Sequence, residues 1–207
     1  LINRSLDKNG ISLAHGDALV IAQKVVSKAE GRLVFLNDVV VSDKARELAV
    51  LSGKDPRLVE LILREAKSII RVREGIIVAE HRNGYIMANA GIDRSNIELK
   101  ESNQSVLLLP ENANKSAKAL RDKLGTISGI YPAVIINDSV GRAWRNGTTG
   151  MALGVSGFDP LWDQAGEKDL FGNVLEVTQP AIADELASGA SFVMGQASQG
   201  QPIIHIS

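Results

Sequence analysis

The stretch Ala133–Gly150 constrains the fold more than any other part of the chain. It opens with an apolar run that includes Val134, Ile135 and Ile136, a composition typical of a short buried strand. Polar side chains follow at once, and in open α/β sheets ligands bind just past the carboxyl ends of strands. An acid, a hydroxyl and two guanidiniums at such an end suit metal and phosphate. The alternative on this stretch alone is a capped turn with solvated arginines. The polar residues are Asn137, Asp138, Ser139, Arg142 and Arg145.

The composition is that of an ordinary globular protein with one sizeable core. The chain has 207 residues, of which 44% are hydrophobic and 23% charged, with a net charge of −1. This balance gives no field that would attract nucleic acid or acidic membranes. No cysteine is present, which excludes disulfides and thiolate chemistry and fits the reducing cytoplasm. No apolar run approaches the ~20 residues of a membrane helix.

Strand and helix patterns mix along the chain without strict alternation, which predicts an α/β fold with a mixed sheet and flanking helices. We treat 1–207 as a single domain. Because the chain begins at Leu1 rather than Met, we expect an N-terminal segment to be missing. The patterns predict helices at 1–9, 42–52, 55–71, 114–124 and 178–194, and strands at 18–22, 33–41, 75–81, 85–88, 106–109, 133–136, 151–157 and 202–206.

Local signals refine several of these boundaries. Ser42 and Asp55 are expected to cap helices, and Thr178 to cap the last one. Gly125 is expected to end the helix that begins near Asn114. Asn83-Gly84 predicts a two-residue hairpin turn of the primed type.

A second strand also ends in polar residues. The strand at 85–88 is followed by A-G-I-D-R-S-N, in which Asp93 could bind a metal and Asn96 a base or phosphate. An Asx-turn explains the same residues, because Asp, Ser and Asn side chains bond their own backbone readily. Lys28, after the strand that begins at Ala18, could neutralise a phosphate, and a surface lysine is the alternative.

The absence of several motifs narrows the chemistry. The chain has no G-x-x-x-x-G-K-[ST], no G-x-G-x-x-G and no G-x-S-x-G. His15, His81 and His205 are far apart and lack metal-ligand spacing. The remaining candidates for chemistry are side chains with oxygen ligands and side chains with a positive charge. Such a set suits Mg²⁺ or Mn²⁺ bound to phosphates. They are Lys28, Asp93, Asp138, Ser139, Arg142 and Arg145.

Four segments in this order resemble the coenzyme F-420 gamma-glutamyl ligase family. They are G-D-A-L-V-I-A-Q-K-V-V-S-K-A-E-G-R (16–32), A-N-A-G-I-D-R-S-N (88–96), I-I-N-D-S-V-G-R-A-W-R (135–145) and A-D-E-L-A with V-M-G-Q-A (183–197). The resemblance covers nearly the whole chain. It implies a gamma-glutamyl ligase-like fold that forms an intertwined homodimer.

The resemblance also implies a GTP-dependent enzyme that joins L-glutamate to a deazaflavin coenzyme precursor through an acyl phosphate. Mg²⁺ or Mn²⁺, as a pair of ions, and a monovalent cation are the implied cofactors. The implied metal ligands are Asp93, Asp138, Ser139 and Gln196, and the implied nucleotide contacts are Gln23, Lys28, Asn96, Gly195 and Gln196. We assign catalysis to Asp138 and, from bidentate phosphate geometry, to Arg142 and Arg145.

Three departures from the family pattern keep alternatives open. The family's N-terminal strand and Gly-Asp segment are absent before Leu1. Val140 and Ala143 stand where the family usually has phenylalanine and proline. The segment 147–150 lacks the acidic residue that many members carry there. The last departure motivates a ligase of the same fold acting on another carboxylate. The first motivates a nucleotide-binding protein without catalysis.

Overall fold

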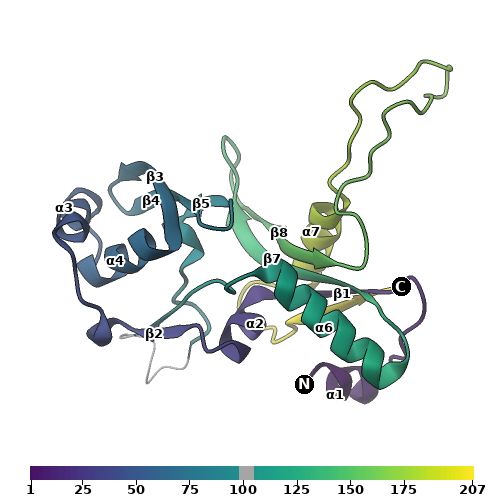
Figure 1. Cartoon of the computed structure of the whole chain (residues 1–207), viewed down its shortest axis with the longest axis horizontal. Helices are drawn as coiled ribbons and strands as arrows, with labels where there is room; N and C mark the ends of the chain where they lie inside the picture. Colours follow the sequence, from purple (N-terminus) through teal and green to yellow (C-terminus); the bar gives the residue numbers. More distant parts are fainter. Residues whose placement is uncertain (98–104) are drawn as a thin grey trace. The chain divides into compact units, whose positions relative to one another are not determined.

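The computed structural model describes residues 1–97 and 105–207. The chain forms two compact units, which we describe separately (Figure 1). In the described part of the chain, no helix is long and apolar enough to cross a membrane. Unit 1 consists of Leu1–Ala22, Ala113–Ser139 and Thr148–Ser207, and unit 2 of Gln23–Asn112 and Val140–Gly147.

Unit 1 is built on a four-stranded mixed sheet, which confirms the predicted sheet type. The strand order is β8-β7-β1-β9, with β1 parallel to β7 and antiparallel to β9. The central strand β1 is apolar throughout, and its Leu19, Val20 and Ile21 have no solvent exposure. Burial on both faces explains why this strand lacks polar alternation. The strands are β1 (Ala18–Ala22), β7 (Ala133–Gly141), β8 (Thr148–Ser156) and β9 (Ile203–Ile206).

Two long helices, α6 (Ala113–Ser128) and α7 (Ile182–Met194), pack against β8, and the short α1 (Ile2–Lys8) precedes the sheet. The predicted end of α6 at Gly125 is wrong, because the helix continues for another turn. A Cβ at Gly125 would lie 2.2 Å from ring atoms of Tyr131. This glycine therefore serves close packing rather than helix termination.

The predicted cap of α7 is also wrong. The helix begins after Ala181, and the carbonyl of Thr178 instead accepts a hydrogen bond from Gln164 N. That bond belongs to a long arm, residues 158–181, which leaves the sheet of unit 1 after β8 and returns to α7 (Figure 1). Backbone bonds such as Gly166 N to Leu175 O at 2.8 Å join its two sides, so the arm is a hydrogen-bonded ladder.

The tip of the arm presents large apolar side chains to solvent. Leu170 is 100% exposed and Phe171 is 90% exposed. Asp169 fixes the turn, since its Oδ1 accepts from the backbone N–H groups of Phe171 and Asn173. Hydrogen bonds from the side chain and backbone of Asn173 hold the pKa of Asp169 below its usual value. The apolar residues are thus displayed on a defined turn.

Unit 2 contains a two-stranded sheet, β2-β6, and a three-stranded antiparallel sheet, β3-β4-β5. Its core is formed by α3, α4, β4 and the segments around β6. The strands are β2 (Leu33–Phe35), β3 (Ala66–Arg73), β4 (Ile76–His81), β5 (Ile86–Ala88) and β6 (Ser105–Leu107); the helices are α2 (Gln23–Ala29), η1 (Leu36–Asp38), α3 (Asp43–Ser52), α4 (Pro56–Glu65) and η2 (Asn89–Gly91).

The helix caps of unit 2 follow the sequence. Ser42 Oγ accepts from Ala45 N at the start of α3, and Asp55 accepts from Arg57 N at the start of α4. The predicted continuation of α4 to residue 71 is wrong, because β3 begins at Ala66 and pairs with β4. The strand predicted at 18–22 is confirmed as β1, and Gln23 begins the helix α2 directly after it.

The hairpin between β4 and β5 forms, but its turn is not of the primed type. Gly84 has φ +93° while Asn83 has an ordinary negative φ. Gly84 N donates to His81 O at 2.8 Å, and His81 N to Tyr85 O at 2.7 Å. This pattern indicates a three-residue loop with glycine at the left-handed position, which also suits the twist of a hairpin.

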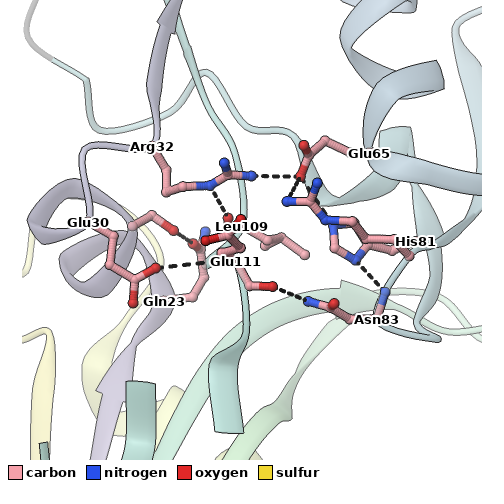
Figure 2. A network of polar contacts seen from close by, with 10 residues as sticks. Gln23, Glu30, Arg32, Glu65, His81, Asn83, Leu109 and Glu111 are labelled. Atoms are coloured by element: carbon pink, nitrogen blue, oxygen red, sulfur yellow. Dashed lines mark hydrogen bonds and ion pairs between the residues drawn. The ribbon is translucent and has the colours of Figure 1, made fainter. Parts of the chain in front are cut away.

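A buried polar network ties four segments of unit 2 together (Figure 2). The Glu65 carboxylate, at the end of α4, accepts from Arg32 Nη2 at 2.8 Å and lies 3.2 Å from Arg82 Nη2. Arg32 Nε also donates to Leu109 O at 2.9 Å. Burial raises the pKa of Glu65, but the contacts with His81 and the two arginines lower it by more. The ionised carboxylate and its partners thus connect residues at or just after the C-terminal ends of α2, α4, β4 and β6.

Candidate functional site

Two lysines of α2 meet the loop that follows η2, and all four residues belong to unit 2. Lys24 and Lys28 are four residues apart, so they share one face of the helix. Lys28 Nζ donates to the backbone carbonyl of Asn96 at 2.7 Å, and Lys24 Nζ lies 2.7 Å from Asp93 Oδ2. Lys28 and Asn96 are thus brought together although 68 residues separate them.

Asp93 is the best-anchored of the predicted ligands in this loop. Its backbone exchanges two hydrogen bonds with Leu107, and its carboxylate accepts from Ser95 N at 2.7 Å and Ser95 Oγ at 2.9 Å. Burial raises the pKa of Asp93, but the hydrogen bond from Lys24 and those from Ser95 lower it by more. The carboxylate is therefore an anion paired with Lys24, and a metal bound there would replace that lysine as its partner.

The chain reaches Asp93 through a left-handed turn. Asn89, Ala90 and Gly91 have φ values of +52°, +51° and +72°. Such values disfavour alanine, which here is also fully buried. A Cβ at Gly91 would lie 2.6 Å from Leu109 Cδ1, so only glycine fits there. Strained backbone of this kind persists where the surroundings enforce it and is frequent at functional sites.

Gln23, predicted as a nucleotide contact, is buried. Its Oε1 accepts from Ser27 Oγ at 2.9 Å, and its Nε2 has no hydrogen-bond partner among the described residues. A buried amide N–H₂ without a partner is costly, which makes it a candidate donor to an incoming polar group. Its role toward a nucleotide stays a prediction.

Unit 1 brings together two of the predicted metal ligands. Ser139 on β7 donates to Gln196 Oε1 at 2.6 Å, and Gln196 follows directly after the end of α7. Asp138 precedes Ser139 on the same strand, and successive strand residues project to opposite faces of a sheet. The structure therefore pairs Ser139 with Gln196 and directs Asp138 to the other face of β7.

Gly195 lets Gln196 reach this position. Its φ of +69° turns the chain sharply after Met194, and a Cβ there would lie 2.4 Å from the side chain of Gln199. Gly195 was predicted to contact the nucleotide. Its visible effect is on the path of the chain, because it returns Gln196 toward β7.

The Ser139–Gln196 pair fits a small divalent cation. Here the two oxygens are held 2.6 Å apart by a hydrogen bond, which a bound cation would replace. Hydroxyl and amide oxygens are suitable hard ligands. Within the described ranges, no group of three or more His, Cys, Asp or Glu side chains is arranged to hold a metal. A metal site among the described residues would therefore need hydroxyl and amide oxygens among its ligands.

Arg142 and Arg145, predicted as phosphate clamps, are both exposed on the short connection between β7 and β8. Arg142 Nη2 makes a long contact of 3.4 Å with Asn146 O. Trp144 between them has a left-handed φ of +56° and is fully exposed, and sequence reasoning gave it no role. Lys24 was missed as well, although its spacing of four from Lys28 on a helix would have placed the two together.

A cavity of about 230 Å³ lies elsewhere in unit 1, at the base of the arm. Its lining includes Asn114, Leu161 and Asp184, whose carboxylate accepts from Ala152 N at 2.8 Å. None of the predicted site residues lines it. The chemistry of the chain is therefore better sought at the two polar clusters described above.

The model of one family, F420-0:gamma-glutamyl ligase, matches residues 1–207. The chain belongs to this family. Two relatives called coenzyme F420:L-glutamate ligase, from Methanothermobacter thermautotrophicus and Methanocaldococcus jannaschii, are each 46% identical to it. The alignments cover 100% and 92% of the chain, and 80% and 75% of the relatives. Another, from Methanopyrus kandleri, is 47% identical over 93% of the chain and 75% of its own length.

Membership in the F420-0:gamma-glutamyl ligase family confirms the resemblance inferred from the four sequence segments. It also assigns the chain to a family of ligases. The segments that carried the resemblance are those that form the two polar clusters: 16–32 and 88–96 supply Lys28 and Asn96, and 135–145 and 183–197 supply Ser139 and Gln196.

Proposed function

We propose that the chain joins the amino group of L-glutamate to a carboxylate of the deazaflavin precursor of coenzyme F420, with GTP as the energy source. The observation that carries this proposal is the family match over the whole chain, together with relatives named coenzyme F420:L-glutamate ligase. GTP and the reaction route come from the family resemblance of the sequence.

In the proposed reaction, a carboxylate oxygen of the precursor attacks the γ-phosphorus of GTP, and GDP leaves. The glutamate nitrogen then attacks the acyl carbon of this acyl phosphate, loses a proton and expels inorganic phosphate. Phosphoryl transfer between two anions depends mainly on positioning and on neutralising charge. Lys28 supplies a positive charge beside Asn96, and Arg142 and Arg145 are the proposed phosphate clamps.

Mg²⁺ or Mn²⁺ would neutralise phosphate charge when bound. We propose two ions, with Ser139 and Gln196 as ligands on one face of β7 and Asp138 as a ligand on the other face. Asp93 is the proposed ligand in unit 2. The adjacent oxygens of Ser139 and Gln196 support this assignment for unit 1. In unit 2, Lys24 holds the Asp93 carboxylate in its ionised form. It keeps that charge balanced until a cation takes its place.

The direct test is incubation of the protein with GTP, Mn²⁺, L-glutamate and the deazaflavin precursor, followed by mass spectrometry. We expect a glutamyl adduct, with one GDP and one phosphate released for each amide formed. A parallel reaction with ATP tests the choice of nucleotide. A folded protein that forms no adduct with either nucleotide would contradict the proposal.

Replacing Asp138 by Asn tests the proposed catalytic role of the Asp138 carboxylate as a metal ligand. Loss of its charge should lower turnover at least roughly a hundredfold, as expected for a major transition-state charge contact. Asp122→Asn on α6 is the control, because Asp122 pairs with Lys118 on the helix surface. Asp138 would be removed from the proposed site if its variant kept the activity of the control.

A second candidate is a ligase of the same fold that uses another carboxylate. The segment 147–150 carries no acid, and the Thr149 hydroxyl lies 2.9 Å from Ser188 Oγ. Competition assays with other carboxylic acids would identify this case by a higher kcat/KM than the deazaflavin precursor gives. GTP binding without any transfer would instead indicate a protein that binds nucleotide only.

We also propose that the protein is a homodimer in which the arm of unit 1 contacts a second copy. The exposed Leu170 and Phe171 at its tip support this, because apolar surface displayed on an ordered turn commonly marks a contact site. Light scattering should give a dimer mass for the wild type and a monomer for Leu170→Ser combined with Phe171→Ser. A monomeric wild type would contradict the proposal.

A further inference from the structure

Gln196 lies in the middle of a hydrogen-bonded chain that extends into α7. Its Oε1 accepts from Ser139 Oγ at 2.6 Å, and its Nε2 donates to Ser191 Oγ at 3.0 Å. Ser139 and Gln196 are accessible to solvent, whereas Ser191 is only 5% exposed. One side of the amide therefore faces a solvent-accessible hydroxyl and the other faces a buried one.

The orientation of this amide decides whether the pair can bind a cation. A glutamine amide carries an acceptor oxygen on one side and a donor N–H₂ on the other. Rotated by 180°, it would direct N–H₂ at Ser139, and the two oxygen ligands would no longer lie side by side. A cation cannot bind to an N–H₂ group, and the Gln196 side chain must also be held beside Ser139 by a contact outside the pair.

We propose that Ser191 is a positioning residue that anchors the Gln196 side chain beside Ser139 and so assembles the divalent cation site. This inference rests on the proposed function, in which Ser139 and Gln196 bind the metal. Ser191 itself does not touch the metal or the substrate. Its hydroxyl accepts a hydrogen bond from the Gln196 N–H₂ group at 3.0 Å, and Ser191 is only 5% exposed.

The local backbone makes this arrangement specific. Ser191 lies on the last turn of α7, and the left-handed Gly195 reverses the chain so that Gln196 folds back toward it. Second partners of metal ligands typically change metal affinity 10–100-fold when removed. Ser191→Ala should therefore raise the Kd for Mn²⁺ at least about tenfold, because the released amide can rotate or move into solvent.

The experiment measures Mn²⁺ binding by electron paramagnetic resonance of free Mn²⁺ in the presence of GDP. We compare the wild type with Ser191→Ala and Ser191→Thr, which keeps the hydroxyl. Ser188→Ala is the matched control, since Ser188 lies one turn earlier on α7 and donates to Gly150 O instead. We expect weak binding for Ser191→Ala, recovery for Ser191→Thr and a Kd within about twofold of wild type for the control.

A double-mutant cycle with Gln196→Ala separates positioning from a general effect on folding. If Ser191 acts through Gln196, its replacement should have no further effect on the Kd in the Gln196→Ala background. An effect of the same size in both backgrounds would overturn the proposal. In turnover assays, Ser191→Ala should raise the Mn²⁺ concentration for half-maximal rate and leave kcat at saturating Mn²⁺ within about threefold of wild type.

The outcomes also distinguish this inference from the function on which it rests. A wild type that makes the glutamyl product but has the same Mn²⁺ affinity as folded Ser191→Ala overturns the positioning role alone. A wild type that binds no Mn²⁺ in the presence of GDP overturns the metal assignment and the positioning role together.

Discussion

At the scale of single residues, Lys24 and Ser95 keep the carboxylate of Asp93 ionised despite its burial. The carboxylate is half-buried, and burial alone would favour its protonated form. Lys24 and the two donors from Ser95 reverse that preference. An acid with a depressed folded-state pKa adds stability above its unfolded pKa, and this stability is lost as pH falls through the folded value.

Lys24→Met tests this balance. Removal of the cation should raise the pKa of Asp93, and the stability that its ionisation adds at neutral pH should fall. Carboxyl-carbon NMR titration would follow the Asp93 resonance directly. Lys28→Met is the control, because Lys28 bonds the Asn96 carbonyl rather than Asp93, and it should leave that pKa near wild type. Equal shifts in both variants would contradict the specific pairing.

At the scale of elements, the ends of helices could be predicted from local sequence signals, but the pairing of strands could not. Ser42 and Asp55 mark helix starts through contacts within a few residues, and both act as predicted. The helical spacing of apolar residues beyond Glu65 was misleading, because Ile69 also fits a strand once β4 is beside it. The two β-bulges of β3 further mask its alternation.

In the candidate site, too, some residues could be identified from the sequence, whereas some contacts required the structure. Asp93, Asn96 and Lys28 could be selected from the sequence because each follows a strand or carries a family motif. The contacts made by Lys24 and Ser191 could not, since they depend on which side chain a distant loop or a chain reversal brings near. Gly125 belongs to this class too, because only the position of Tyr131 explains it.

Two glycines inside helices provide a matched test of packing. Gly125→Ala in α6 should destabilise the protein by about 1–3 kcal/mol, since the new methyl group would overlap the Tyr131 ring. Gly189→Ala in α7 meets nothing within 4 Å and should stabilise it by about 0.5–1 kcal/mol through helix propensity. Denaturant titrations would measure both, and the same sign for the two variants would contradict this account.

At the scale of the whole molecule, one buried pair connects the beginning of the chain to its end. His205 Nε2 on β9 lies 2.7 Å from Asp17 Oδ2, 188 residues away, beside the first strand. The backbone N–H of Ala14 and the contact with His205 hold the pKa of Asp17 below its usual value. Asp17 therefore adds stability above its unfolded pKa and loses that contribution as pH falls through the folded value.

Asp17→Asn should make the stability of the protein less sensitive to acid. It keeps an acceptor for Ala14 N but removes the charge, so wild type and variant should differ most near neutral pH and converge toward about pH 3. We expect the variant to melt about 2–4 °C lower at neutral pH, equivalent to roughly 1 kcal/mol. Calorimetric scans across this range would measure it; parallel curves would contradict the role of ionisation.

The position of β1 at the centre of the unit 1 sheet has a consequence for synthesis on the ribosome. This strand emerges first, yet both its partners, β7 and β9, are made much later, and β9 is among the last residues. Most of unit 2 lies between them in sequence and is complete long before. Both edges of this apolar strand thus stay unpaired in the nascent chain until β7 has been made, and one edge until β9 has been made, which favours slow folding and a need for chaperones.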